Sequence, residues 1–459
     1  MGAGKTTLGE EVARRINRSF IDLDHAIELA AKRSIAELFQ EGEEVFRGYE
    51  QRAMGIFMMQ PSRVIALGGG AITNPQARVV LHEYAITLWL DEDVETCWER
   101  VRGSDRPLAQ DEAAFRRLFE ERRPLYAQAA DFVVRDANDA VLAAAGVHVA
   151  RGALRRLGEL VPGDGKAVLI SDPNVAGIHG MDAQLALGTR LAQVHELPAG
   201  EDAKTITALE RLWQDLRVDR HGTIVALGGG CTTDAAGFAA ATYLRGVDWV
   251  PVPSSLVAQV DAAIGGKTGI DLPQGKNLVG AFHWPVRTVI DPALLDTLPP
   301  AQRLEGMAEV VKTGLLAGEP LWELPDDELV RRCAAFKAAI CLRDPHDRAE
   351  RKMLNLGHTF AHALETAAGY EGLSHGRAVA LGLVAALRLS GRDVGQVEEI
   401  LHPKPVRLDR DRAWQAMQRD KKNVGGELRL VLLGDDGPQW DVTVPAADVR
   451  RELDALIVT

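Results

Sequence analysis

Four polar side chains near residue 355 have the spacing expected for one face of a helix. Arg351, Asn355, His358 and His362 follow one another at intervals of four, three and four residues. At about 100° per residue, such groups point the same way from a helix. A single histidine in this setting is more often a satisfied core or surface residue. Four polar groups on one face need something polar to face, so we predict one helix that presents them to a ligand site.

A second segment supplies carboxylates and an amine at similar spacing. Glu305, Glu309 and Lys312 are separated by four and three residues, and His375 follows the turn-prone run 369–374. Two imidazoles and one carboxylate from separate elements leave room for an oxygen ligand. That is the donor set of a catalytic zinc site, whereas structural zinc sites are closed by four protein ligands. The spacing therefore predicts a metal centre that does chemistry.

Composition and charge restrict the class of protein. The chain has 459 residues, 46% hydrophobic and 26% charged, so we expect two or three domains of a globular enzyme. A net charge of -12 argues against a nucleic-acid partner, and local lysines and arginines must hold any anionic substrate. The four cysteines form no CxxC pair, which favours a reducing, cytoplasmic setting. No apolar run approaches the ~20 residues of a membrane span, and no signal-peptide core opens the sequence.

The first residues contain the second half of a phosphate-binding loop. Gly4, Lys5 and Thr6 precede an amphipathic helix, as in the pattern GxxxxGK[ST]. Amides at the helix start would hold phosphates, Lys5 would reach the β and γ oxygens, and Thr6 would hold Mg²⁺. The first glycine of the pattern would fall upstream of Met1, together with the strand that normally delivers the loop. We expect either a start codon assigned too far downstream or a damaged kinase unit with two unpaired strand edges.

The first 145 or so residues alternate between expected strands and helices. A strand over 20–24 ends in Asp22 and Asp24, and a buried strand over 64–67 runs into three glycines. A further strand covers 86–90. This alternation predicts a parallel sheet with helices on both faces.

The order of motifs in residues 1–140 resembles shikimate kinase. GAGKTT, FIDLD, GE..FR..E, GGG, RPL and R.PLY occur in sequence, and together they are far more specific than any one of them. The resemblance implies a P-loop kinase domain over 1–145 that binds ATP with Mg²⁺ and phosphorylates shikimate. It assigns the nucleotide to Gly2, Gly4, Lys5, Thr6, Thr7 and Arg106, and Mg²⁺ to Thr6 and Asp22. It assigns shikimate to Asp24, Arg47, Gly68, Gly69, Gly70 and Arg122.

Residues 147–297 also contain phosphate-binding features. Expected strands over 166–170 and 223–227 are buried, and the second runs into Gly228–Gly230 before a helix. Glycines in that place suit the pyrophosphate of a dinucleotide, although simple turn punctuation explains such a run as well. Lys267 and Lys276 stand in glycine-rich loops of an acidic protein. They indicate an anion pocket, the alternative being solvated loop lysines.

Residues 147–459 resemble 3-dehydroquinate synthase throughout. The motifs GGG...D..GF.AATYLRG, GGKTGI, GKN.VGAF, AEV.K and R...N.GH...H occur in order, and Asp347 stands where the family usually has Glu. The resemblance implies an α/β protein with a Rossmann-like NAD domain over 146–297 and a mainly helical metal-binding domain over 298–459. It implies that a divalent metal, usually zinc with cobalt as an alternative, is bound by Glu309, His358 and His375. It places NAD against Glu201, Lys204, Gly229, Gly230, Asp234, Ser254, Ser255 and Thr297. Its catalytic set is Lys267, Lys312, His362, Asn355, Arg351 and Asp261, and its further substrate contacts are Arg245, Lys276, Asn277 and Lys421.

The two resemblances imply a bifunctional shikimate-pathway enzyme. The synthase unit would convert 3-deoxy-D-arabino-heptulosonate 7-phosphate to 3-dehydroquinate and phosphate with catalytic NAD, and would form a homodimer. A plain metal-dependent alcohol dehydrogenase would not need the cations around the metal set. Two alternatives stay open. In one, the P-loop unit is only a binding or regulatory module; in the other, the second unit is a related cyclase that acts on a different sugar phosphate.

Overall fold

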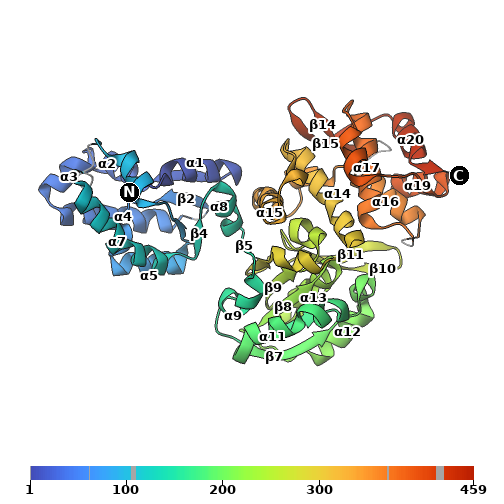
Figure 1. Ribbon diagram of the computed structural model, residues 1–459, viewed down its shortest axis with the longest axis horizontal. Coiled ribbons are helices and arrows are strands. Elements are labelled where there is room, and N and C mark those ends of the chain that lie inside the picture. The colour runs from blue at the N-terminus through green and yellow to red at the C-terminus, as the bar shows by residue number, and fades with distance from the viewer. Residues whose placement is uncertain (1, 61, 105–109, 370–371, 420–427, 459) are drawn as a thin grey trace. The chain divides into compact units, whose positions relative to one another are not determined.

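The chain divides into two compact units. The computed structural model describes residues 2–60, 62–104, 110–369, 372–419 and 428–458. The units are Met1–Ala145 and Gly146–Thr459, and each is drawn in Figure 1. A further division of the second unit at residue 297 remains a prediction. None of the helices in the described ranges is both long and apolar enough to cross a bilayer.

The first unit alternates short strands with helices. Its elements are α1 (Lys5–Arg15), β1 (Ser19–Asp22), α2 (Leu23–Ala31), α3 (Ile35–Glu41), α4 (Glu43–Met58), β2 (Arg63–Ala66), α5 (Pro75–Tyr84), β3 (Leu88–Leu90), α6 (Val94–Val101), α7 (Glu112–Ala129), β4 (Phe132–Val134) and α8 (Ala137–Ala144). Side chains set several helix starts. Asp22 caps α2, and Ser34 with Glu37 forms a capping box on α3. The strand expected over 20–24 therefore ends at Asp22, and Asp24 lies in the first turn of α2, a correction to the sequence prediction.

The strands of the first unit form two separate parallel pairs. β1 pairs with β2, and β3 pairs with β4. Within the described residues, β2 and β3 each have one strand partner only. Val64 and Ile65 of β2 are half-buried. The expectation of a fully buried strand over 64–67 was therefore wrong, because a strand is buried on all sides only when strands flank both of its edges.

A four-stranded parallel sheet organises the start of the second unit. Its order is β7 (Leu191–Glu196), β6 (Ala167–Ser171), β8 (Thr223–Gly228) and β9 (Asp248–Pro253). Every residue of β6 and β8 is buried, as predicted. Their alternate side chains enter two cores, one with α12 (Ile206–Asp215) and α13 (Gly230–Thr242), the other with α9 (Leu157–Leu160) and α11 (Met181–Leu187). Helices thus cover both faces, as Figure 1 shows.

Two strand pairs adjoin this sheet. β5 (Val147–Val149) pairs in parallel with β12 (Thr288–Ile290). β10 (Lys267–Leu272) and β11 (Gly275–Phe282) form an antiparallel hairpin that contacts α13. This hairpin carries both lysines that the sequence assigns to an anion pocket. It is therefore the element that holds those charges against the sheet.

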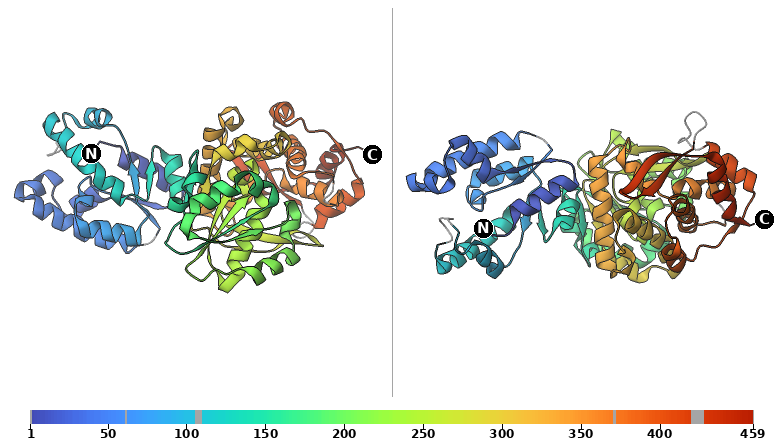
Figure 2. Two further views of the ribbon diagram at one scale, coloured as in Figure 1. Left: turned by 60° about the horizontal axis from the view of Figure 1, so that its bottom comes forward. Right: turned by 90° about the horizontal axis from the view of Figure 1, so that it is seen from above.

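The rest of the second unit is mostly helical, as Figure 2 shows. Its helices are α14 (Pro300–Ala317), α15 (Asp326–Arg343), α16 (His358–Ala367), α17 (His375–Leu389), α18 (Gly395–Leu401), α19 (Arg410–Arg419) and α20 (Ala446–Ala455). Its strands are β13 (Val406–Arg407), β14 (Leu428–Gly434), β15 (Gly437–Val444) and β16 (Ile457–Val458). One apolar core joins α14, α16 and α17 through side chains such as Val311, Phe360 and Val384. The three helices that carry the predicted metal ligands therefore pack directly on one another.

The polar face predicted over 351–362 is not one helix. Arg351 and Asn355 lie in a 3-10 helix, Glu350–Asn355, and α16 begins at His358. Gly357 between them has φ 78°. A Cβ on this residue would lie 2.8–2.9 Å from backbone atoms of Gly382 and Leu383 on α17. The close approach to α17 requires a glycine in the left-handed region, and that glycine interrupts the helix.

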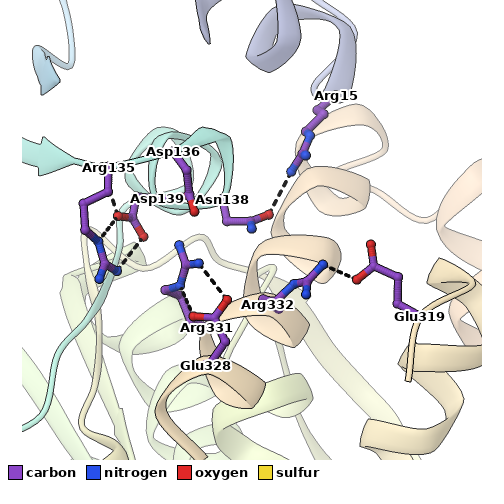
Figure 3. Close-up of polar contacts among 9 residues, drawn as sticks. All are labelled: Arg15, Arg135, Asp136, Asn138, Asp139, Glu319, Glu328, Arg331 and Arg332. Carbon is purple, nitrogen blue, oxygen red and sulfur yellow. Dashed lines mark hydrogen bonds and ion pairs between the residues drawn. The ribbon is translucent and has the colours of Figure 1, made fainter. Parts of the chain in front are cut away.

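Polar pairs also tie down the ends of helices within each unit, and four of them are drawn in Figure 3. The pairs are Arg15–Asn138 and Arg135–Asp139 in the first unit, and Glu328–Arg331 and Glu319–Arg332 in the second. Glu319 follows α14, and Arg332 lies on α15.

Candidate active sites

Three helix segments bring Glu309, His358 and His375 together. Glu309 lies in the middle of α14, and the two histidines are the first residues of α16 and α17. Nε2 of His358 lies 3.4 Å from Oε1 of Glu309, and Nε2 of His375 lies 3.3 Å from the same oxygen. Ligand atoms of the three residues all lie within 4.8 Å of one another. This is the spacing of a metal centre with three protein ligands.

The outer nitrogen of each imidazole faces an acceptor. Nδ1 of His358 lies 3.2 Å from the carbonyl oxygen of Leu356, and Nδ1 of His375 lies 3.3 Å from Oε1 of Glu365. A carbonyl and a carboxylate can only accept, so each Nδ1 carries a hydrogen. When a ring is neutral, as a bound metal requires, its lone pair therefore sits on Nε2, which points at Glu309. Such outer partners orient metal-binding histidines in known sites.

The electrostatics of the three residues favour a cation. Burial lowers the pKa of His358, which keeps that ring neutral. Burial would also lower the pKa of His375, but its hydrogen bonds to Glu309 and Glu365 raise the pKa to about 10. A protonated His375 thus places its positive charge between the carboxylates of Glu309 and Glu365. The donor set fits a divalent metal, which would displace that proton.

Two buried lysines surround the carboxylate side of this centre. Lys312, one turn after Glu309 on α14, contacts Oε2 of Glu309. Although burial alone would raise it, the pKa of Glu309 is held well below its ordinary value by Lys312 and the two imidazoles. Asp261 lies in a π-helical turn, Ala258–Ala262, with Oδ1 2.8 Å from Nζ of Lys337 and 3.9 Å from Nζ of Lys312. Each buried ammonium group on this side of the site therefore lies beside at least one carboxylate.

Further cations come from loops and the β10–β11 hairpin. Nζ of Lys267 lies 2.5 Å from Oδ2 of Asp347. Arg351 is buried, donates to the carbonyl oxygen of Pro345, and lies over the ring of Phe282. These pairings hold the cations in place until an anion competes for them.

Two more predicted side chains lie close to the metal set along the chain. The His362 ring stands edge-on to that of His358, with centroids 5.6 Å apart, one turn along α16. Nδ2 of Asn355 donates to the carbonyl oxygen of Lys352 within its 3-10 helix. The pairing of His358 with His362 therefore follows the predicted spacing, whereas Asn355 belongs to a different element.

Several residues predicted to bind a dinucleotide lie at the carboxyl ends of the sheet strands. Gly229 is the N-cap residue of α13 and directly follows β8, and a Cβ on Gly229 would lie 3.5 Å from Oγ of Ser255. Ser254 follows β9, and its amide donates to the carbonyl oxygen of Gly228. A Cβ on Gly230 would touch Ala262. Bare backbone therefore lines the start of α13, where its amides can meet a pyrophosphate.

An ionic cluster borders that site. Nζ of Lys204 lies 2.9 Å from Oδ2 of Asp234 and contacts Oδ1 of Asn277. Nζ of Lys276 lies 2.5 Å from Oε1 of Glu201. Lys204 and Glu201 were predicted to contact NAD, and their partners Asn277 and Lys276 were predicted to contact the substrate. The two predicted subsites therefore adjoin.

Two predicted residues stand apart from this cluster. Thr297 contacts Nε2 of His179 through its hydroxyl at 2.8 Å. Arg245 is exposed and lies in a 3-10 helix, Tyr243–Arg245, with φ 68°. Its predicted contact with the substrate therefore stays a prediction.

The segment predicted to bind phosphate lies at the start of α1. Gly4 precedes the helix with φ 90°, and Lys5, Thr6 and Thr7 form its first turn. Oγ1 of Thr6 donates to Oδ2 of Asp22 at 2.6 Å. A hydroxyl and a carboxylate in contact at a helix start form the oxygen pair that suits Mg²⁺. Gly2 has φ 76°, and a Cβ there would lie 2.3 Å from the carbonyl oxygen of Cys97.

The residues expected at shikimate gather around Gly68–Gly70. Arg122 and Tyr126 both donate to the carbonyl oxygen of Gly69, at 3.2 and 2.6 Å. A Cβ on Gly70 would overlap the guanidinium of Arg47, and one on Gly68 would lie 2.8 Å from carboxylate oxygens of Asp24 and Glu50. The predicted set therefore surrounds one glycine turn. Arg106 and Lys421 lie outside the described residues.

Several site residues were not predicted from the sequence. They are Glu50, which binds Arg47; Asp172, which accepts from Thr232; Asp271, near Lys204; Lys337, which binds Asp261; and Glu365, which binds His375. Three carried a local signal. Glu365 lies seven residues after His358, on the same face of α16, Lys337 interrupts an apolar run on α15, and Glu50 lies one turn after Arg47 on α4. Asp172 and Asp271 are brought into place by contacts between distant segments.

Three family descriptions match the chain. Shikimate kinase matches residues 1–150, 3-dehydroquinate synthase N-terminal matches 194–305, and 3-dehydroquinate synthase C-terminal matches 306–423. The 3-dehydroquinate synthase of Bordetella pertussis is 38% identical over 341 residues, which span 67% of this chain and 95% of the relative. That of Gloeobacter violaceus is 41% identical over 347 residues, or 68% and 96%. A structure of 2-deoxy-scyllo-inosose synthase complexed with carbaglucose-6-phosphate, NAD+ and Co2+ has a TM-score of 0.61 at 25% identity, over 67% of this chain and 96% of that one.

These findings define an α/β enzyme that combines a P-loop domain with a Rossmann-like domain of the type found in sugar-phosphate cyclases. The chain belongs to the 3-dehydroquinate synthase family and carries a shikimate kinase domain at its N-terminal end. Both domains are those of shikimate-pathway enzymes. The family assignments made from the sequence motifs are therefore confirmed.

Proposed function

We propose that the second unit converts 3-deoxy-D-arabino-heptulosonate 7-phosphate to 3-dehydroquinate and phosphate, using catalytic NAD and a divalent metal, zinc or cobalt. The observation that carries this proposal is the convergence of Glu309, His358 and His375, with both Nε2 atoms directed at one carboxylate oxygen. A dinucleotide site at the start of α13 and the cations around the metal set support it. A substrate with a carboxylate and a phosphate needs positive charge at two places.

The chain's own residues would orient the substrate and move protons. When bound, the metal would supply Lewis acidity at one ring hydroxyl. NAD, when bound, would supply a hydride acceptor for the carbon that bears this hydroxyl. Lys267, Lys276 and Arg351 would hold the two anionic ends. Asp261 would fix the ammonium groups of Lys312 and Lys337. His362, one turn from His358, is placed to carry a proton to or from the reacting end or to hold the phosphate.

We propose that the first unit phosphorylates shikimate with ATP and Mg²⁺. The contact between Thr6 and Asp22 supports a Mg²⁺ position at the start of α1. Arg47 and Arg122 beside the glycine turn support a site for the shikimate carboxylate. Phosphoryl transfer depends mostly on positioning and positive charge, which these groups can supply. ATP binding without turnover would instead indicate a regulatory module.

The metal proposal is tested with His358→Ala. We expect metal content to fall to background and phosphate release from the heptulosonate phosphate to fall more than about 100-fold, since a direct ligand matters more than an outer-shell residue. His221→Ala removes an exposed histidine of the same unit and is the matched control. Full activity of the His358→Ala protein after chelation would refute the metal assignment.

The similarity to 2-deoxy-scyllo-inosose synthase makes a different sugar-phosphate substrate the second candidate. Phosphate release from another sugar phosphate, with none from the heptulosonate, would identify such a cyclase. A homodimer through the second unit and a cytoplasmic location also remain proposals. Light scattering on the full chain, compared with variants at any interface so found, would test the first.

A further inference from the structure

Glu305 contacts both neighbours of the metal-binding residue His375. It lies on α14, one turn before Glu309, and faces the start of α17. Its Oε1 accepts a hydrogen bond from Oγ of Ser374, and its Oε2 accepts one from the backbone amide of Gly376 at 2.6 Å. One carboxylate thus holds the residue before His375 and the residue after it.

This carboxylate supplies the cap that α17 does not supply for itself. Ser374 is the N-cap residue of α17, but its side chain makes no capping hydrogen bond within the helix. Instead the hydroxyl turns to Glu305, and the Gly376 amide, one of the unpaired donors of the first turn, does the same. The negative charge also faces the positive end of the helix dipole. The beginning of α17 is therefore capped by a side chain of α14.

The backbones of the two helices also touch at this place. A Cβ on Gly376 would lie 2.4–2.8 Å from the carbonyl oxygen, Cα and carbonyl carbon of Glu305. Real Cβ atoms do not approach backbone so closely, so only glycine permits this contact. The first turn of α17 is thus seated directly on α14 at residue 305, and Glu309 follows one turn later on the same helix.

We propose that Glu305 is a positioning residue that seats His375 against the helix bearing Glu309. The inference rests on the proposed metal site, because its consequence is the affinity and geometry of that site. Glu365 orients the ring of His375, whereas Glu305 fixes its backbone. A shift of α17 along α14 would move Nε2 of His375 away from Glu309 without changing any ligand.

The test measures Co²⁺ binding to metal-free full-length protein. Competition with a chelator gives the affinity, and the visible absorption of bound Co²⁺ reports the ligand geometry. The variants are Glu305→Ala, Glu305→Gln and Ser374→Ala. Glu319→Gln is the matched control, since it removes a carboxylate just beyond the other end of α14 that pairs with Arg332.

We expect Glu305→Ala to weaken Co²⁺ binding about 10-fold to 100-fold, as outer-shell changes do, and to alter the absorption bands. Glu305→Gln should recover part of the affinity, because its amide oxygen still accepts from Gly376. Glu319→Gln should leave affinity and spectrum unchanged. If Glu305→Ala does not fold, the weaker binding expected of Ser374→Ala decides the question.

Two results would contradict the proposal in different ways. Unchanged affinity and spectrum in the Glu305 and Ser374 variants, with binding still lost in His358→Ala, would remove the role of Glu305 and leave the metal site intact. Absence of Co²⁺ binding by the wild-type protein would instead overturn the metal site itself. A loss of thermal stability with an unchanged spectrum would also contradict the proposal, because a purely structural role predicts that outcome.

Discussion

At the scale of residues, the candidate metal centre depends on charges that are removed from water together. Glu309 and Lys312 have exposed fractions of 0% and 1%. A buried ion pair contributes little net stability, but breaking it by removing one partner is costly because the other charge stays buried. The pair therefore fixes a local arrangement rather than the fold. It keeps an ammonium group beside the carboxylate that would bind the metal.

Glu309→Gln should lower the free energy of unfolding of the metal-free second unit by about 3 kcal/mol. The reason is that, among the residues that the structure describes, Lys312 then retains only Asp261, at 3.9 Å, as a carboxylate partner. Calorimetry on metal-free full-length chain measures the change. In the double variant Glu309→Gln/Lys312→Met both charges are absent, and most of the stability should return. A double variant no more stable than Glu309→Gln would contradict this account.

The cluster of candidate ligands could be predicted from the sequence, but its setting could not. The i, i+3 and i, i+4 spacings of Glu309 with Lys312 and of His358 with His362 are local, and each pair does lie on one helix. Arg351 and Asn355 were wrongly extended onto the same helix, because nothing in the spacing shows that Gly357 must meet α17 closely. Lys337 approaches Asp261 from a helix far along the chain. Such contacts depend on packing between elements and leave no periodic signal.

At the scale of elements, the turn over residues 344–351 positions two cations of the candidate site, Lys267 and Arg351. Oδ1 of Asp344 accepts from the amide of Arg348, and Oδ2 accepts from the amides of Ala349 and Arg351. The same turn directs Asp347 to Lys267. Asp344 thus organises the loop between α15 and the 3-10 helix that bears Arg351.

Asp344→Ala should raise KM for the sugar phosphate about fivefold, which corresponds to a loss of roughly 1 kcal/mol in positioning, and should lower kcat less. Steady-state kinetics on phosphate release measures both quantities. Asp344→Asn should have an intermediate effect, since its single amide oxygen can replace only one of the two carboxylate oxygens that accept from the turn. Equal kinetics in the alanine variant and the wild type would show that the turn holds without Asp344.

The same residue predicts a pH dependence of stability. Although burial alone would raise it, three backbone amides leave the pKa of the Asp344 carboxyl below its ordinary value of 3.8. The unfolded chain therefore binds the proton more tightly than the folded chain. The contribution of the Asp344 carboxylate to the free energy of unfolding is complete above pH 3.8 and is lost as the pH falls through the folded-state pKa. Thermal melts between pH 3 and 6 should show a weaker acid dependence in Asp344→Asn than in the wild type.

The strands show a similar limit of sequence-based prediction. Runs of β-branched and apolar residues correctly located β6 and β8, which lie inside a continuous sheet and are buried throughout. The same kind of run over 64–67 became β2, whose burial is partial because it pairs on one side only. Burial of a strand depends on its neighbours, and those are set by distant parts of the chain.

At the scale of the whole molecule, each of the two units has an apolar core of its own. The main apolar core of the first unit lies within residues 23–129, and the largest core of the second lies within residues 308–457. Each candidate site takes its described residues from one unit only. We therefore expect each activity to respond to changes in its own unit.

Lys5→Ala should remove kinase turnover and leave the synthase unchanged. Lys5 begins α1 at the proposed phosphate site, and loss of a phosphate-contacting lysine should lower turnover by more than about 100-fold. Coupled measurement of shikimate-dependent ADP formation gives the kinase rate. Arg14→Ala, at the other end of the same helix, is the control. Loss of synthase activity in soluble Lys5→Ala protein would mean that the units are coupled.

We propose that the chain contains two independent active sites of the shikimate pathway, one in each unit. The test uses four full-length proteins: the wild type, Lys5→Ala, His358→Ala and the double variant. Each is assayed for shikimate-dependent ADP formation and for phosphate release from 3-deoxy-D-arabino-heptulosonate 7-phosphate. The account predicts that each single variant loses only its own activity and that the double variant loses both. Retention of phosphate release in His358→Ala, or the loss of both activities in either single variant, would contradict it.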